Sequence, residues 1–231
     1  MDSGHDYYIL DAQYDFYGRR FATCSSDHSI RIWDQAPDGT WNPSAQILKA
    51  SRSALSRLSW ASPEYGTLLA VASEDSTVSI WEEQANPSSP SAPSSAPSSA
   101  PSSAPSSAPS STPSWVCRAT LKESLRAVTA VAFAPPCWGL RLATAAMDGV
   151  VRVYEAVDVM NLALWPLHET FEGGREEGRV MVLSWNPCRF DPPMLVVGGR
   201  GGGSGCGWGG RTVVAGGEGR GEGGGGRCCV S

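Results

Sequence analysis

The sequence predicts an all-β fold, a β-propeller with an incomplete set of blades. One block occurs three times without gaps: FATCSSDHSIRIWD at 21–34, LAVASEDSTVSIWE at 69–82 and LATAAMDGVVRVYE at 142–155. The aromatic residue near its end is Trp33, Trp81 or Tyr154. When the biased stretch at 86–114 is left out, both intervals are close to the ~40–45 residues of a four-stranded propeller blade. A short segment of alternating apolar and polar residues also precedes each block, as expected for a strand.

Each block carries an aspartate six positions before its aromatic residue. The three pairs are Asp27 with Trp33, Asp75 with Trp81, and Asp148 with Tyr154. An aspartate in a tight turn accepts hydrogen bonds from nearby backbone N–H groups, so we expect it to hold the turn between two strands. The aromatic residue supplies a large apolar area, which we expect to lie between neighbouring blades.

The segments before the blocks are predicted to be the first strands of the blades. They read LDAQYDF at 10–16, LSRLSWAS at 55–62, VTAVAFAP at 128–135 and VMVLSWNP at 180–187. The fourth segment is followed by MLVVGG at 194–199, but no aspartate and aromatic pair comes after it. We therefore expect a partial propeller over residues 1–199, with about three and a half blades.

Two segments have compositions that do not suit a folded core. Residues 86–114 repeat Pro, Ser and Ala without a charge or a large apolar side chain, which predicts a disordered loop between blades two and three. Residues 200–231 are rich in Gly and Arg, which predicts a disordered tail. A weak RNA-binding segment and a misread gene end would both give the tail this composition.

The composition argues against several classes of function. The net charge is −5 and no basic cluster occurs, so we expect no direct binding of nucleic acid. No apolar run of about 18 residues is present, so we expect no membrane insertion. The seven cysteines and three histidines are dispersed, without metal-ligand spacing or a nucleophile and base pair. We therefore predict a non-enzymatic protein that has no catalytic residues, metal, cofactor or small-molecule substrate and acts through protein contacts.

The repeats are typical of the WD-repeat family, and longer stretches resemble one branch of it. Residues 15–34, 59–83, 133–169 and 184–187 resemble the Seh-type nucleoporins, which are siblings of the Sec-thirteen subunit of the COPII vesicle coat. The segment YEAVDVMNLALWPLHE at 154–169 favours the nucleoporin branch over the coat branch.

The resemblance implies a fold and a role. Members of this family form an open six-bladed propeller, and a helical partner nucleoporin of the Y-shaped outer-ring scaffold donates the blade that closes it. We therefore expect a structural subunit of the nuclear pore complex at the nuclear envelope, supporting transport of protein and mRNA. Two alternatives stay open: a subunit of the GATOR complex in TOR signalling, at the periphery of the lysosomal or vacuolar membrane, and a COPII-like coat subunit.

The resemblance also implies where the partner binds. In the family the donated blade lies beside blade one, so the N-terminal strand region at 7–16 is the expected contact. Alternate residues of this strand share one face. The candidate contact residues are Tyr8, Leu10, Ala12 and Tyr14.

Overall fold

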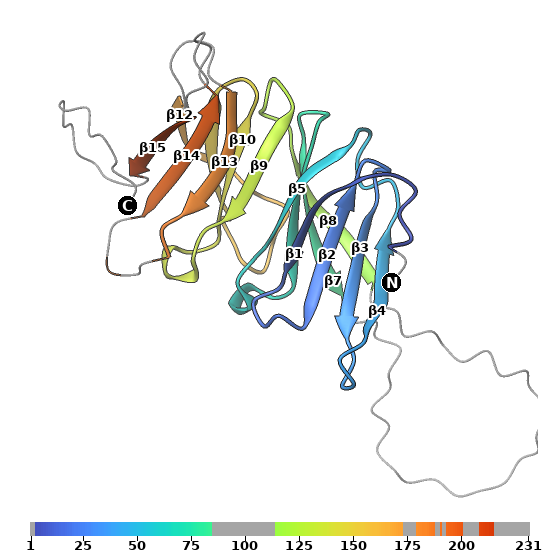
Figure 1. Cartoon of the computed structure of the whole chain (residues 1–231). Coiled ribbons are helices and arrows are strands. Elements are labelled where there is room, and N and C mark those ends of the chain that lie inside the picture. Colours follow the sequence, from blue (N-terminus) through green and yellow to red (C-terminus); the bar gives the residue numbers. More distant parts are fainter. Residues whose placement is uncertain are drawn as a thin grey trace, which may run out of the picture.

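The computed structural model describes residues 3–84, 114–172, 179–187, 190, 193–200 and 208–214, and in these ranges the regular structure is β-strands and two short 3-10 helices (Figure 1). Blade one contains β1 (Ile9–Tyr14), β2 (Arg20–Ser25), β3 (Ile30–Gln35) and β4 (Trp41–Ile47). Blade two contains β5 (Leu55–Trp60), β6 (Leu68–Ser73), β7 (Val78–Gln84) and β8 (Ser114–Leu121). Blade three contains β9 (Val128–Phe133), β10 (Arg141–Ala146), β11 (Val150–Glu155) and β12 (Leu167–Glu172). Blade four contains β13 (Arg179–Trp185), β14 (Met194–Arg200) and β15 (Trp208–Val214).

The blades follow one another in chain order, as Figure 1 shows, and every strand pair is antiparallel. The first strands of neighbouring blades, β1, β5, β9 and β13, lie next to one another. Turns containing the 3-10 helices η1 (Pro63–Tyr65) and η2 (Pro136–Trp138) join the first and second strands of blades two and three. Within the described residues the four sheets form no closed ring. The prediction of an all-β, incomplete propeller is confirmed.

The hydrophobic core lies between blades rather than within them. Between blades one and two it contains Ala22, Cys24, Ile30, Ile32, Ile47, Leu55, Leu58, Leu69 and Val71. Between blades two and three it contains Ala61, Leu68, Ala70, Ala72, Val78, Ile80, Leu121, Val128, Val131, Leu140, Leu142, Ala146, Tyr154, Leu162 and Trp165. Between blades three and four it contains Ala130, Ala134, Ala143, Ala145, Val151, Val153, Trp185, Leu195 and Val197. Each blade is therefore stabilised chiefly by packing against the blade or blades next to it.

The position predicted for the Pro/Ser/Ala segment is wrong. It was expected between blades two and three, but β7 and β8 pair with each other in one sheet, with Gln84 opposite Ser114. The segment is therefore inserted within blade two, between its third and fourth strands. Ser114 belongs to β8, and the predicted disorder of the remaining residues falls outside the described part of the chain.

Blade four also differs from the expectation. Residues 208–214 form β15, which pairs with the whole length of β14, so a part of the segment expected to be a tail is a strand. Arg200 is the last residue of β14, and the expectation of disorder for the rest of 200–231 falls on residues outside the described ranges.

Candidate interaction surface

The three aspartates of the repeated block occupy the same position in their blades. Asp27 Oδ1 accepts hydrogen bonds from Ser29 N at 2.8 Å and Ser29 Oγ at 2.6 Å. Asp75 Oδ1 binds Thr77 N at 3.0 Å and Thr77 Oγ1 at 2.6 Å, and Asp148 Oδ1 binds Val150 N at 3.0 Å. The residue after each aspartate, His28, Ser76 or Gly149, has a positive φ of 68°, 70° or 80°. Each carboxylate thus closes a tight turn between the second and third strands.

These carboxylates make stability depend on pH. Burial alone would raise their pKa values, but the hydrogen bonds outweigh it and hold the pKa of Asp27, Asp75 and Asp148 below the ordinary 3.8. A carboxyl whose pKa is lowered by folding stabilises the fold above its unfolded pKa, and this contribution is lost as the pH falls towards the folded pKa. We expect the midpoint of thermal unfolding to be nearly constant between about pH 7 and 5 and to fall below about pH 4.

A variant separates this effect from general acid denaturation. Replacing Asp75 and Asp148 by asparagine keeps an acceptor oxygen in each turn but removes the titration. The double variant should have a lower midpoint at neutral pH and a shallower fall below pH 4, measured by circular dichroism during heating. An unchanged slope would show that other groups control the acid transition.

The aromatic residues of the repeated blocks show which face of each blade packs against the preceding blade. Trp81 packs with the core between blades one and two, and Tyr154 belongs to the core between blades two and three. Each therefore lies on the face turned towards the preceding blade. Trp33 is the equivalent residue of blade one, and it lies outside the core that blade one shares with blade two. The expectation that it would lie between two neighbouring blades is therefore not met in the described residues.

We define the outward face of blade one by Ala12, Tyr14, Phe21, Trp33 and Trp41. Its rings form a continuous cluster: Phe21 stacks on Trp33 with ring centroids 5.8 Å apart, and it meets Trp41 edge to face at 4.8 Å. Tyr14 lies 5.6 Å from Phe21 and is 63% exposed. Trp33 is only 5% exposed, so the part of this inter-blade face in contact with water is Ala12, Tyr14 and the partly exposed rings of Phe21 and Trp41.

Alternation along β1 places the candidate contact residues. Asp11 faces blade two, since its Oδ2 accepts a hydrogen bond from Leu58 N at 3.0 Å and its Oδ1 lies 3.5 Å from Arg57 Nη1. Ala12 and Tyr14 are exposed. Leu10 is exposed beside a break in the β1–β2 register between Ile9 and Asp11, and Tyr8, just before the strand, is also exposed. These four remain candidates for the partner contact.

The N-terminal segment is fastened to blade one by His5, which the sequence analysis did not single out. Its Nδ1 lies 2.9 Å from Asp27 Oδ2, and its Nε2 lies 2.8 Å from Thr23 Oγ1. Thr23 in turn accepts the indole N–H of Trp33 at 3.5 Å. With a proton on Nδ1, all three hydrogen bonds have consistent donors and acceptors. No local pattern marks this histidine, because its partners lie 18 or more residues away.

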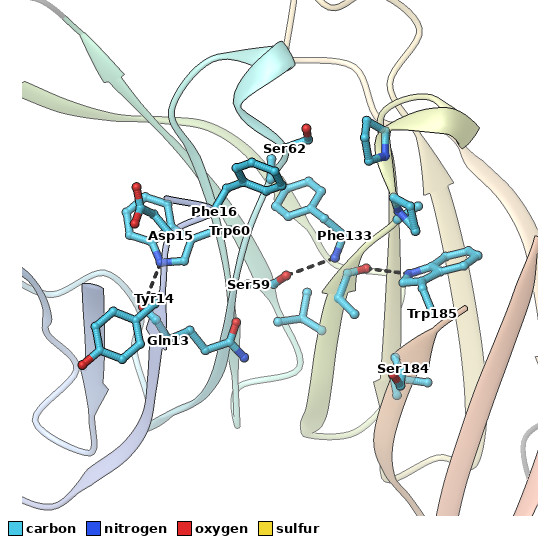
Figure 2. Close-up of a pocket in the computed structure, with 17 residues that line it drawn as sticks. Gln13, Tyr14, Asp15, Phe16, Ser59, Trp60, Ser62, Phe133, Ser184 and Trp185 are labelled. Atoms are coloured by element: carbon cyan, nitrogen blue, oxygen red, sulfur yellow. Dashed lines mark hydrogen bonds between the residues drawn. The ribbon is translucent and has the colours of Figure 1, made fainter. Parts of the chain in front are cut away.

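A hollow of about 430 Å³ lies at the ends of the first strands of all four blades. Figure 2 shows the side chains that line it. Its polar groups join neighbouring blades. Trp60 Nε1 donates to Gln13 O at 3.0 Å, Phe133 N donates to Ser59 Oγ at 3.1 Å, and Trp185 Nε1 donates to Ala132 O at 3.1 Å. The one acidic side chain in the lining, Asp15, accepts hydrogen bonds from the backbone N–H groups of Arg19 and Arg20. The polar groups of the hollow therefore hold the blades in register.

The described residues offer little for two other kinds of site. They contain no group of three or more His, Cys, Asp or Glu side chains arranged to hold a metal ion. None of their helices is long and apolar enough to cross a bilayer.

The sequence of this chain is similar to those of known proteins. The family described as WD domain, G-beta repeat matches residues 2–34 and 43–82, which fall in blades one and two. Nucleoporin SEH1 of Danio rerio is 40% identical over 197 residues, covering 84% of this chain and 48% of that protein. Nucleoporin SEH1 of Homo sapiens is 39% identical over 196 residues, covering 84% and 49%. The chain thus spans about half the length of these relatives. With its repeated four-stranded blades, the chain carries WD repeats and resembles the SEH1 nucleoporins.

Proposed function

We propose that the chain is a non-enzymatic scaffold subunit of the nuclear pore complex that acts through protein contacts. The similarity to nucleoporin SEH1 over 84% of the chain supports the assignment to the pore. The outward face of blade one is the observation that carries the mode of action. It is built like an inter-blade face, and within the described residues no other sheet covers it.

A helical partner nucleoporin of the Y-shaped subcomplex supplies strands that pack on this face as an additional blade. The repeat itself favours this occupant. In blade two the equivalents of Phe21 and Trp33 are Leu69 and Trp81, and both pack against the sheet of blade one. A partner sheet that turns apolar side chains towards blade one therefore fits the outward face, just as the sheet of blade one fits Leu69 and Trp81 of blade two. Burial of a large side chain such as Tyr14 contributes about 1.5–3 kcal/mol to such an interface.

The experiment that tests this proposal compares two tyrosines of similar exposure. Tyr14→Asp introduces a charge into the outward face, whereas Tyr17→Asp does so in the β1–β2 turn, where Tyr17 is 67% exposed. Each tagged chain is expressed in cells and purified by affinity, and the co-purifying proteins are quantified by mass spectrometry. We expect Tyr14→Asp to lower the recovery of helical nucleoporins at least tenfold and Tyr17→Asp to leave it unchanged.

Two results would contradict the proposal in different ways. Equal recovery with both variants would move the contact away from the outward face. Recovery of COPII coat subunits or of GATOR subunits in place of nucleoporins would assign the chain to one of the alternative complexes. Thermal unfolding of both variants serves as the control for folding.

A further inference from the structure

The loop between β11 and β12, residues 156–166, exposes apolar side chains although it has a defined structure. Met160 is 92% exposed, Val157 68% and Leu164 58%, and Val159 is exposed as well. The loop lies on blade three and is not part of the outward face of blade one. Contiguous exposed apolar side chains commonly mark a protein interaction site.

Two buried anchors hold the loop in place. Leu162 and Trp165 are buried in the core between blades two and three. Trp165 Nε1 donates to Leu162 O at 2.8 Å, and the ring of Trp165 lies 6.3 Å from that of Phe133. Because the loop is already ordered, a partner that binds its exposed side chains does not have to offset the entropy cost of ordering the loop.

Hydrogen bonds fix the tip of the loop as well. Met160 N donates to Asp158 Oδ1 at 2.8 Å, and Asn161 N donates to Asp158 O at 3.1 Å. Val157 N donates to Leu164 O at 3.4 Å, which closes the base of the loop. Val157, Met160 and Leu164 are thus held by a closed loop rather than by a freely extended segment.

The surroundings of the loop are acidic. Asp158 lies in the loop and Glu155 directly before it, and residues 155–167 contain no Lys or Arg. Glu172 lies opposite Val150, at the end of β11 away from the loop. Arg141 lies opposite Glu155 in the β10–β11 register and forms an ion pair with it at 3.2 Å. Asp158, at the loop itself, is exposed and has no ion pair among those found in the described residues. This charge favours a basic partner and disfavours an anionic lipid surface.

We propose that the β11–β12 loop binds an amphipathic, basic α-helix of a partner protein. The apolar stripe of the helix packs on Val157, Met160 and Leu164, and its Lys or Arg side chains lie towards Asp158. The flexible thioether of Met160 adapts to different apolar side chains of the helix. The proposal does not depend on the blade-one contact or on the assignment to the nuclear pore.

The binding experiment uses the whole chain and a defined probe. A fluorescein-labelled peptide long enough for about four helical turns, with Leu on one helical face and Lys on the other, is titrated with protein and followed by fluorescence anisotropy. A scrambled peptide of the same composition lacks the apolar stripe and serves as the peptide control. We expect saturable binding of the striped peptide, at least tenfold weaker binding of the scrambled one, and weaker binding of the striped peptide at high salt.

Variants of the chain assign the site. Met160→Ser with Leu164→Ser should weaken binding of the striped peptide at least tenfold. Leu125→Ser is the matched control, because Leu125 is 83% exposed and lies in the β8–β9 turn, and it should leave the affinity unchanged. Unchanged binding to the double variant, or equal binding of the scrambled peptide, would overturn the proposal. Stronger binding of vesicles rich in phosphatidylserine than of the peptide, lost in the double variant, would also overturn it.

Discussion

Replacing Tyr154 by alanine should lower the free energy of unfolding by about 3–5 kcal/mol, the range found when a large buried aromatic side chain is removed. Tyr154 is 1% exposed and packs in the core between blades two and three, together with Leu68, Leu142 and Trp165. Its removal leaves a cavity that side chains of two sheets border, and neither sheet can close it alone. Urea denaturation followed by tryptophan fluorescence measures the change.

Tyr154→Phe separates the ring from the hydroxyl group. The hydroxyl donates to Glu123 Oε2 at 3.0 Å, and burial together with the nearby Glu123 carboxylate raises the pKa of Tyr154 above its ordinary range. Loss of this hydrogen bond should cost about 1–3 kcal/mol, less than loss of the ring. If alanine and phenylalanine destabilise equally, the hydrogen bond rather than inter-blade packing is the main contribution of Tyr154.

Replacing Asp27 by alanine should be the second large effect, with a loss of about 2–4 kcal/mol from several hydrogen bonds to one charged group. The carboxylate binds Ser29 N, Ser29 Oγ, His5 Nδ1 and Asp6 N, the last at 3.1 Å. The side chain of His5 is fully buried, so loss of Asp27 leaves a buried imidazole without this partner. Besides the loss of stability, the N-terminal segment should detach from blade one.

Hydrogen exchange distinguishes these two consequences. In the Asp27→Ala variant, the amides of residues 3–8 should exchange much faster than those of β6 and β10. Asp27→Asn is the matched control, because one amide oxygen still accepts the Ser29 bonds, and it should lose less stability. Unaltered exchange at 3–8 would mean that the segment is held by contacts other than the His5 and Asp27 pair.

Much of the blade architecture could be predicted from the repeated block. Its apolar alternation indicated the second and third strands, and the segments before it indicated β1, β5, β9 and β13. The outer strands β4, β8 and β12 were not identified. β4 reads WNPSAQI, and although it alternates apolar and polar residues, Pro43 within the run and its mostly exposed positions weaken it as a strand signal. This gap is also the reason that the insert was placed between blades rather than within blade two.

The candidate surface was less predictable than the fold. Alternation along β1 indicated Ala12 and Tyr14, but the outward face also includes Phe21 and Trp41. Phe21 belongs to the repeated block, where its equivalents are buried between sheets. Only the arrangement of the blades shows that its face lacks a preceding sheet. His5 depends on partners in a different strand and turn, so no sequence pattern near it indicates its role.

The position of the insert within blade two has a consequence for the evolution of this chain. Gln84 and Ser114 are register partners, so the segment between them leaves and re-enters the sheet at one point. The entropy of joining two ends grows slowly with length, and about 30 residues in place of a turn of about five cost only ~1.5 kcal/mol. A tandem repeat could therefore lengthen or shorten here by replication slippage without altering the contacts of any blade.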